Sequence, residues 1–181
     1  MDTINKERLS LLAKSIHIPK YDELPNMGLY LEQTTKYINQ VLEPLGCVEI
    51  TASMIRNYVK MGLIKNPVKK TYDANHIAHL LCITMLKVVM PLENIRKMFK
   101  LQEEVYTDAV AYNYFCLELE NVISFCFGLS NSIKKIGETH SLEKEMLRST
   151  IIAISHTIYL NACFRFVTAQ EENKTETEDV K

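Results

Sequence analysis

A short segment near the middle of the chain carries side chains that suit nucleic-acid recognition. In TASMIRNYVKMGLI, residues 51–64, Ser53, Arg56, Asn57 and Lys60 recur at intervals of three and four. On a helix they share one face. A helix fits the major groove of DNA, where arginine can bond guanine and asparagine can bond adenine through two hydrogen bonds each. This face therefore predicts DNA binding, and the alternative is a solvated amphipathic helix with no partner.

The residues after this helix are strongly basic. Gly62 ends the helix, and LIKNPVKKTY, residues 63–72, has Pro67 at its middle. This segment is too short for a core element and predicts a tight turn or a small hairpin. Its lysines, which suit the phosphates beside a major groove, are Lys65, Lys69 and Lys70.

The distribution of charge supports the same prediction. The net charge of the chain is only −1. Residues 51–100 carry nine basic and two acidic side chains, whereas residues 1–50 carry five and seven, and residues 101–181 carry seven and thirteen. A basic middle within a neutral whole is typical of a surface that docks on a polyanion. A solvated lysine-rich face is the alternative.

Other chemistry finds little support in the sequence. His76, His79 and Cys82 recur every three residues, but one helix offers too few ligands for a metal without others from elsewhere. Neither His140 nor His156 has a carboxylate or nucleophile at a telling spacing, and the five glycines form no phosphate loop. We expect no metal, no cofactor and no enzymatic activity.

The composition predicts the elements that must position the basic segment. Apolar residues make up 47% of the chain and only ten residues are glycine or proline, so we expect a mainly α protein. Thr51 or Ser53 can cap the helix described above, Asp73 the next one and Ser141 the last. In the first helix, Ile4, Leu11, Leu12 and Ile16 are available to one apolar side. The expected helices cover residues 3–16, 29–42 and 51–61, one from Asp73, one from Pro91, and two long ones at 102–136 and 141–168.

Features along the rest of the chain point to the cytoplasm. The N-terminus lacks the apolar core of a secretory signal, and an odd number of cysteines, five, without a CxxC pair suits free thiols in a reducing compartment. The apolar run 151–167 is interrupted by His156, Asn161 and Arg165, which predicts a buried helix rather than a membrane span. The acidic tail 169–181 has no apolar face and is predicted to be disordered.

The order of these motifs resembles the winged helix-turn-helix of MerR-type transcriptional regulators. The resemblance covers about residues 51–98 and is most like an uncharacterised bacterial family with a MerR-like core, domain of unknown function 1836. In such regulators the residues matching Arg56 and Tyr58 mainly hold phosphates, which leaves Asn57 and Ser53 to touch bases. The matching residues are Ile55, Arg56, Tyr58, Gly62 to Ile64, Tyr72, Asp73, His76, Ile77, Leu80, Ile83, Leu86 and Pro91 to Ile95. The predicted DNA-contact residues are Ser53, Arg56, Asn57, Tyr58, Lys60, Lys65, Lys69, Lys70 and Tyr72.

The chain also departs from the MerR pattern. The wing between Ile64 and Tyr72 is shorter than usual, Asn57 replaces the first aromatic of a pair, and an extra segment precedes the first helix of the core. The short wing and the neutral net charge favour an alternative function, a protein–protein adaptor that keeps the fold without binding DNA.

These observations predict a mainly α protein with a winged helix-turn-helix core and a short wing at residues 29–100. An N-terminal helical extension, 1–28, precedes the core and a helical hairpin, 101–168, follows it. The expected function is a cytoplasmic, sequence-specific regulator that binds double-stranded DNA as a homodimer through residues 102–168, with no membrane contact. A small apolar effector could sit among the aromatic side chains of residues 111–130; a helix packed on both sides is the alternative.

Overall fold

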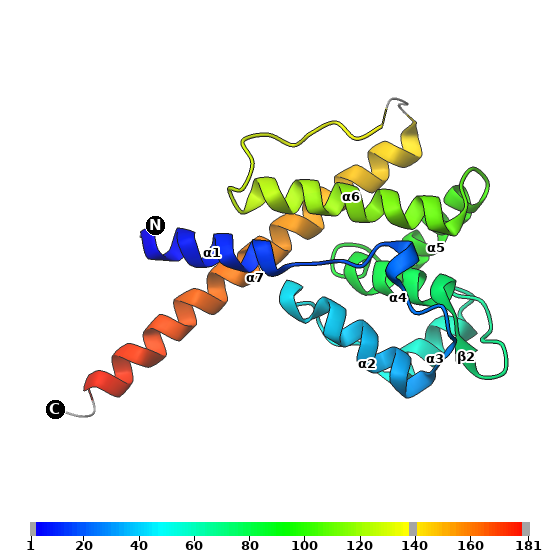
Figure 1. Ribbon diagram of the computed structural model, residues 1–181, viewed down its shortest axis with the longest axis horizontal. Coiled ribbons are helices and arrows are strands. Elements are labelled where there is room, and N and C mark those ends of the chain that lie inside the picture. The colour runs from blue at the N-terminus through cyan, green and yellow to red at the C-terminus, as the bar shows by residue number, and fades with distance from the viewer. Residues whose placement is uncertain (1–2, 138–140, 179–181) are drawn as a thin grey trace.

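The computed structural model describes residues 3–137 and 141–178, and within them the protein is mainly helical, as predicted (Figure 1). The helices are accompanied by one two-stranded sheet. In chain order the elements are α1 (Thr3–Ser15), a 3₁₀ turn (Tyr21–Glu23), β1 (Leu29–Tyr30), α2 (Leu31–Leu42), a 3₁₀ turn (Glu43–Leu45), α3 (Ala52–Lys60), β2 (Thr71–Tyr72), α4 (Ala74–Leu86), α5 (Leu92–Glu103), α6 (Asp108–Cys126) and α7 (Leu142–Glu178).

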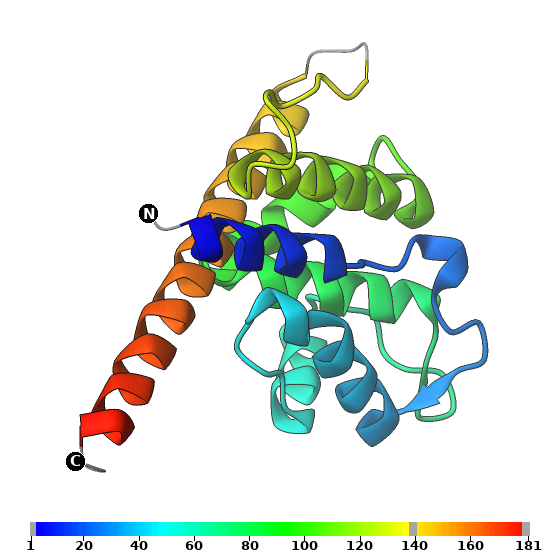
Figure 2. The same ribbon diagram turned by 60° about the vertical axis from the view of Figure 1, so that its left-hand side comes forward.

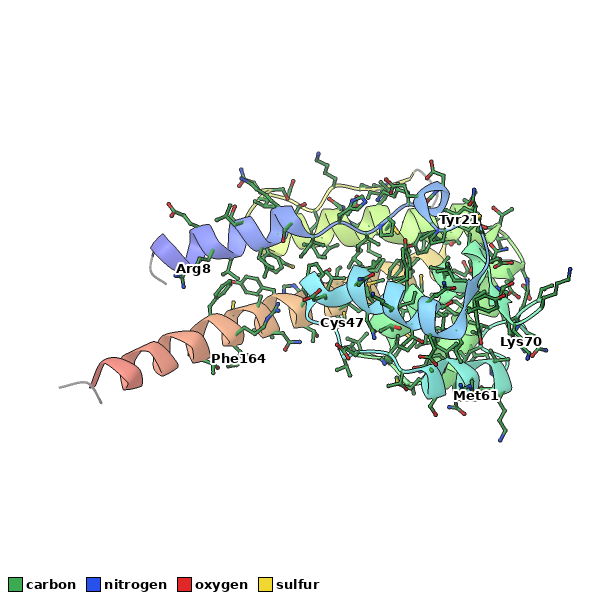
Figure 3. All side chains as sticks on the ribbon, turned by 60° about the horizontal axis from the view of Figure 1, so that its bottom comes forward. Arg8, Tyr21, Cys47, Met61, Lys70 and Phe164 are labelled. Carbon is green, nitrogen blue, oxygen red and sulfur yellow. The ribbon has the colours of Figure 1, made fainter. Side chains whose placement is uncertain are left out.

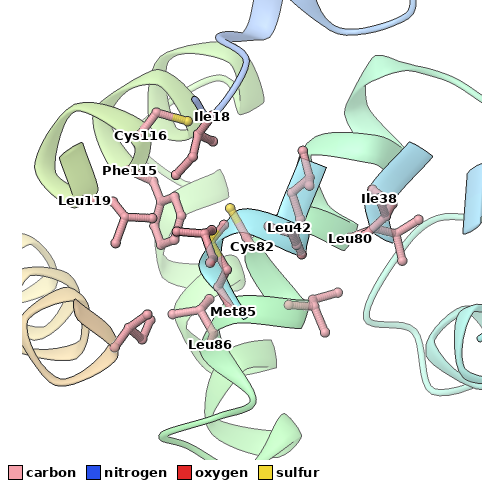
Figure 4. Close-up of a cluster of buried hydrophobic side chains, with 14 of the residues drawn as sticks. Ile18, Ile38, Leu42, Leu80, Cys82, Met85, Leu86, Phe115, Cys116 and Leu119 are labelled. Carbon is pink, nitrogen blue, oxygen red and sulfur yellow. The ribbon is translucent and has the colours of Figure 1, made fainter. Parts of the chain in front are cut away.

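Helix α4 forms the centre of the molecule. Ten of its thirteen residues are buried, because α2 packs on one side of it and α6 on the other (Figure 2). Figure 4 shows this core, in which Ile38 and Leu42 of α2 and Phe115 of α6 lie around Leu80 and Leu86. Because α4 is apolar on nearly every side, it packs against both α2, in the N-terminal half of the chain, and the C-terminal helices α6 and α7.

The small sheet connects the chain before α2 with the chain before α4. Strands β1 and β2 are antiparallel, with Leu29 opposite Tyr72 and Tyr30 opposite Thr71. The predicted helix 29–42 is therefore wrong at its start, because Leu29 and Tyr30 pair with a partner 41 or 43 residues away in sequence. A helix pattern read from local sequence cannot show such a pairing.

The predicted helix 102–136 corresponds to α6 but is wrong at both ends. Helix α5 runs on to Glu103, and α6 begins only after Thr107, whose side chain accepts a hydrogen bond from the backbone N–H of Val110 at 3.4 Å. Helix α6 ends at Cys126, where Gly128 takes a left-handed φ of 74° and the N–H of Leu129 donates to the carbonyl of Ser124 at 2.8 Å. A cap and a left-handed glycine thus bound the helix at both ends.

Helix α7 begins after Ser141, as predicted, and the Ser141 Oγ accepts a hydrogen bond from the N–H of Lys144 at 3.4 Å. The helix continues to Glu178, so the acidic segment 169–178 is helical rather than disordered as the sequence predicts. Glutamate, glutamine and lysine are good helix formers, which favours continuing a helix that has already begun. The last residues of the predicted tail, 179–181, lie outside the described part of the chain.

Burial on α7 is one-sided rather than complete. Ile151, Ile154 and Ile158 are buried, whereas Leu160 and Phe164 are 53% and 68% exposed. By length and composition the segment Leu142–Thr168 could cross a membrane, a property that the core helix of a soluble protein can share. Its buried side packs mainly against α6.

Helix α1 buries one apolar side, which differs in part from the predicted one. Leu9 and Ala13 of α1 are buried and Leu12 and Ile16 are partly buried, but Leu11, expected on the apolar side, is 66% exposed. The side chain of Ile4 lies outside the described residues. All five cysteines have free thiols, as the sequence predicts.

Candidate nucleic-acid interface

Helix α3 begins at a side-chain cap and is anchored to α2. The hydroxyl of Thr51, rather than of Ser53, accepts a hydrogen bond from the N–H of Met54 at 3.2 Å. Just before it, the Asn39 amide of α2 donates to the carbonyl of Ile50 at 3.0 Å and accepts from the Ile50 N–H at 2.9 Å. Sequence analysis missed Asn39, because a bidentate amide bond to a loop leaves no periodic signal.

The two faces of α3 separate as the spacing predicts. Ile55 and Tyr58 are buried against the core. The polar residues at intervals of three and four are all exposed: Ser53, Arg56, Asn57 and Lys60. The structure therefore brings four of the predicted DNA-contact residues together on one accessible helix face.

Gly62 ends α3, as predicted. It has a left-handed φ of 69°, and the N–H of Leu63 donates to the carbonyl of Tyr58 at 2.9 Å. This pattern is a Schellman cap, in which glycine avoids the strain of a side chain. Leu63 and Ile64 then enter the core and fix the direction in which the basic segment leaves the helix.

The basic segment folds into a tight hairpin of residues 68–71, which we call the lysine hairpin. The N–H of Thr71 donates to the carbonyl of Val68 at 2.9 Å, and these two residues form a β-bridge. Between them, Lys69 and Lys70 have positive φ angles of 50° and 65°. Positive φ at both central residues is the geometry of a type I′ turn, which favours Asn-Gly. A lysine there costs on the order of 1 kcal/mol.

Close packing holds the lysine hairpin in place. A Cβ added to Gly28 would lie 2.6 Å from Thr71 Oγ1 and 2.7 Å from Thr71 Cβ, so only glycine lets the chain before β1 approach this closely. Thr71 Oγ1 also donates to the carbonyl of Val68 at 2.7 Å. Sequence analysis missed the role of Gly28, since its contact lies 43 residues further along the chain.

Asp73 fixes the junction of the lysine hairpin with α4. Its carboxylate accepts a hydrogen bond from the N–H of His76 at 3.1 Å, and the Asp73 N–H lies 3.2 Å from His76 Nδ1, which confirms the predicted cap. Burial opposes ionisation of Asp73, but hydrogen bonds from His76 and Asn75 outweigh it and lower the pKa of the carboxyl group. The ionised carboxylate therefore stabilises the start of α4.

Two predicted contact residues do not lie on the surface. Tyr58 and Tyr72 are only 3% and 4% exposed. Burial raises the pKa of Tyr72, and the nearby charge of Arg56 partly opposes that rise. Both rings therefore belong to the core beneath the candidate interface, and we leave them out of it.

The charged residues of the candidate interface are all positive. Between Thr51 and Tyr72 there are five basic side chains and no acidic one. All five are exposed, and among the described residues none forms an ion pair within 4.0 Å. Figure 3 shows Lys70 projecting outward at the end of the molecule that also carries Met61, the residue after α3. The five basic residues are Arg56, Lys60, Lys65, Lys69 and Lys70.

The histidines and cysteine weighed as metal ligands each have other surroundings. His76 Nδ1 lies 2.6 Å from Asp73 Oδ1, and His79 Nδ1 lies 2.8 Å from the carbonyl of Asn75. Burial raises the pKa of the Cys82 thiol well above its usual value. Although His76, His79 and Cys82 are spaced three residues apart on α4, their side chains therefore lie in three different environments.

Comparison with known families finds one match. The family model described as Domain of unknown function (DUF1836) matches residues 19–115, just over half of the chain. The matched segment runs from the residues after α1 into α6 and includes the whole candidate interface. Neither the curated proteins nor the solved structures include a significant match.

Proposed function

This chain belongs to the DUF1836 family, and we propose that it is a sequence-specific DNA-binding transcriptional regulator with a MerR-like winged helix-turn-helix. In this proposal α2 and α3 are the two helices of the motif, and the lysine hairpin is its short wing. The observation that carries the proposal is the exposed face of α3, polar and basic, with no acidic residue between Thr51 and Tyr72. A helix with such a face suits the major groove.

The exposed residues have separate roles in the proposal. Arg56 and Lys60 contact phosphates at the edge of the groove, and Asn57 and Ser53 face the base edges. The lysines of the basic segment, Lys65, Lys69 and Lys70, contact the flanking backbone.

The strain of the lysine hairpin supports this assignment. Two consecutive lysines occupy left-handed positions that asparagine and glycine would fill at lower cost. Strained residues gather at functional sites, where the surrounding structure holds them. Lysine at both positions of the turn presents two positive charges at the tip of the wing.

We further propose that the regulator acts as a homodimer through residues 102–168. DNA sites read by helix-turn-helix proteins often consist of two half-sites related by two-fold symmetry. Helix α7 projects well beyond the rest of the molecule (Figure 1). Its exposed apolar residues Leu160, Phe164 and Val167 are spaced to form a seam with a second copy.

The salt dependence of DNA binding tests the proposal. Replacing Lys69 and Lys70 with alanine should weaken binding to every duplex sequence and reduce the log–log salt slope by about 0.9 for each lost phosphate contact. The matched control replaces another adjacent pair, Lys134 and Lys135, which is exposed in the loop after α6. In Figure 1 this loop runs along the top of the molecule, whereas β2 beside the lysine hairpin lies at the lower right. That control should leave both affinity and slope unchanged.

Two outcomes would contradict the proposal. An unchanged slope in the first variant would remove the lysine hairpin from the interface. If the wild-type chain selects no sequence from a random duplex library, the protein–protein adaptor becomes the better account of this fold.

A further inference from the structure

A second candidate site lies on the side of α4 that faces α5, α6 and the start of α7. A cavity of about 460 Å³ opens there, within the size range of small-molecule sites. Most of its wall is apolar or aromatic, including Leu86, Met98, Phe99, Phe115 and Leu147. A ligand that fills this cavity must therefore have an apolar body.

One end of the cavity carries a cluster of hydrogen-bond acceptors from three helices. His79 of α4 and Asp108 of α6 line the cavity. Glu103, at the end of α5, is exposed and lines an adjoining hollow with Asp108 and Lys65 rather than the cavity itself. One ligating atom from each of His79, Glu103 and Asp108 lies within 4.8 Å of the other two. A nitrogen placed among three atoms that are at most 4.8 Å apart can lie within about 2.8 Å of all three, which is within hydrogen-bond range. We call His79, Glu103 and Asp108 the acceptor cluster.

The acceptor cluster has no lysine or arginine partner in the described part of the chain. The His79 ring directs Nδ1 at the carbonyl of Asn75, 2.8 Å away, so Nδ1 is the donor of that bond and Nε2 is the ring atom that faces the carboxylates. Nε2 lies 3.7 Å from Asp108 Oδ1, which is too far for a hydrogen bond. No described lysine or arginine pairs with Glu103 or Asp108 within 4.0 Å.

The rest of the wall argues against an anionic ligand. Two carboxylates, Asp108 and Glu143, line the cavity, whereas Lys144 is its one lysine. The Lys144 ammonium lies 5.7 Å and 5.6 Å from the ring centroids of Tyr106 and Tyr114, so aromatic faces already surround that charge. A ligand carboxylate would add a third negative charge to the wall.

We propose that the cavity binds a small apolar amine, with its hydrocarbon body against the aromatic wall and its ammonium group within the acceptor cluster. An ammonium offers three donors, one for each residue of the acceptor cluster. Its positive charge is attracted by the two carboxylates of that cluster, Glu103 and Asp108. The site does not include the exposed face of α3, although Lys65 of the basic segment lines the same hollow as Glu103 and Asp108. The proposal does not depend on DNA binding.

The test compares three probes that share one apolar body. Isothermal titration of the full-length protein at neutral pH would measure 4-phenylbutylamine, 4-phenylbutan-1-ol and 4-phenylbutanoate. We expect the amine to bind at least tenfold more tightly than the other two. Asp108→Asn and Glu103→Gln should each weaken amine binding about tenfold, and the matched control Glu104→Gln, which removes an exposed neighbouring charge outside the cluster, should not. Ala111→Leu, which fills the cavity from α6, should weaken all three probes.

Each contrary result has a definite meaning. Equal binding of amine, alcohol and carboxylate would show an apolar cavity without a cation site. Amine binding that survives both Asp108→Asn and Glu103→Gln would place the ammonium elsewhere. If Zn²⁺ binds at the cluster and displaces the amine at lower concentration, the cluster is a metal site. Any of these results, or no binding of the amine, would overturn the proposal.

Discussion

Asn57 differs from its neighbours on α3 because it offers hydrogen bonds without a charge. It is exposed between Arg56 and Lys60 on the same helix face. Within the protein its side-chain amide donates a weak hydrogen bond to the sulfur of Met61 at 3.4 Å and keeps its oxygen and second N–H for other partners. Its amide is therefore available to a base edge, and its removal affects specificity without changing the electrostatic attraction to DNA.

We predict that Asn57→Ala costs about 1–3 kcal/mol of binding free energy on the preferred site and relaxes the preference at one base pair. The salt slope should stay the same because no charge is lost. Site selection from a random duplex library at fixed salt measures the effect. Asn94→Ala, an exposed asparagine on α5, is the control, and identical sequences recovered with Asn57→Ala would show that Asn57 reads no base.

Asp73 controls stability through its protonation. Its pKa in the folded protein is lowered from the usual 3.8, so its contribution to stability is complete above pH 3.8. That contribution is lost as the pH falls through the lower folded pKa. We predict that the unfolding free energy of wild type falls more steeply below pH 3.8 than that of Asp73→Asn, because asparagine also caps a helix but does not titrate.

Urea denaturation between pH 7 and pH 2 measures the difference. Asp22→Asn removes another exposed carboxylate, outside the cap of α4, and should keep the wild-type slope. Parallel curves for wild type and Asp73→Asn would show that the cap does not depend on the ionised carboxylate.

At the scale of the element, the two lysines of the lysine hairpin have opposite effects: their positive φ angles lower the stability of the fold, and their charges favour DNA binding in the proposed function. Replacing Lys69-Lys70 with Asn-Gly should relieve the left-handed strain and raise the unfolding free energy by about 1 kcal/mol. The same change should weaken DNA binding because two charges are lost. The variant Lys69→Ala with Lys70→Ala loses the charges but keeps the strain, so it should bind equally weakly without the gain in stability. If the Asn-Gly variant has the same unfolding free energy as wild type, then Lys69 and Lys70 are not strained in their left-handed conformations.

The elements that the sequence predicts well are those with local signals. The start of α3 at Thr51, its end at Gly62 and the start of α7 after Ser141 each follow from a cap within three residues of the helix end. Strand β1 has no such signal, because Leu29 becomes a strand only by pairing with Tyr72. The break between α5 and α6 is predicted too early in the chain, before residue 102, although Thr107 is an ordinary cap that marks the start of α6.

At the scale of the molecule, the candidate DNA interface and the acceptor cluster differ in how far their residues lie apart in sequence. The interface residues fall within one segment of 22 residues, Thr51 to Tyr72, so helical spacing alone brings most of them together. The cluster joins His79, Glu103 and Asp108 from three helices. Only the packing of α5 and α6 against α4 brings these side chains together, which no local pattern in the sequence could indicate.

Helix α7 carries the surface that would join two molecules. Leu160, Phe164 and Val167 recur at intervals of four and three and are 53%, 68% and 49% exposed, so they form an apolar strip on the projecting part of the helix. A strip of this spacing buries its side chains when two helices pack side by side. The side of α7 that packs within the chain is formed by other residues, among them Ile151 and Ile158, so loss of the strip should leave the fold intact.

We predict that the wild-type protein is a dimer at micromolar concentration and that Phe164→Glu is a monomer with an unchanged circular dichroism spectrum. Burying a glutamate between two apolar strips would cost more than the contact gains. Leu142→Glu is the matched control, because Leu142 lies at the other end of α7 and is also 68% exposed; it should remain a dimer. Sedimentation equilibrium measures the mass of each. A monomeric wild type, or a Phe164→Glu variant that still dimerises, would remove this strip from the proposed assembly, and a two-fold symmetric DNA site would then require a different interface.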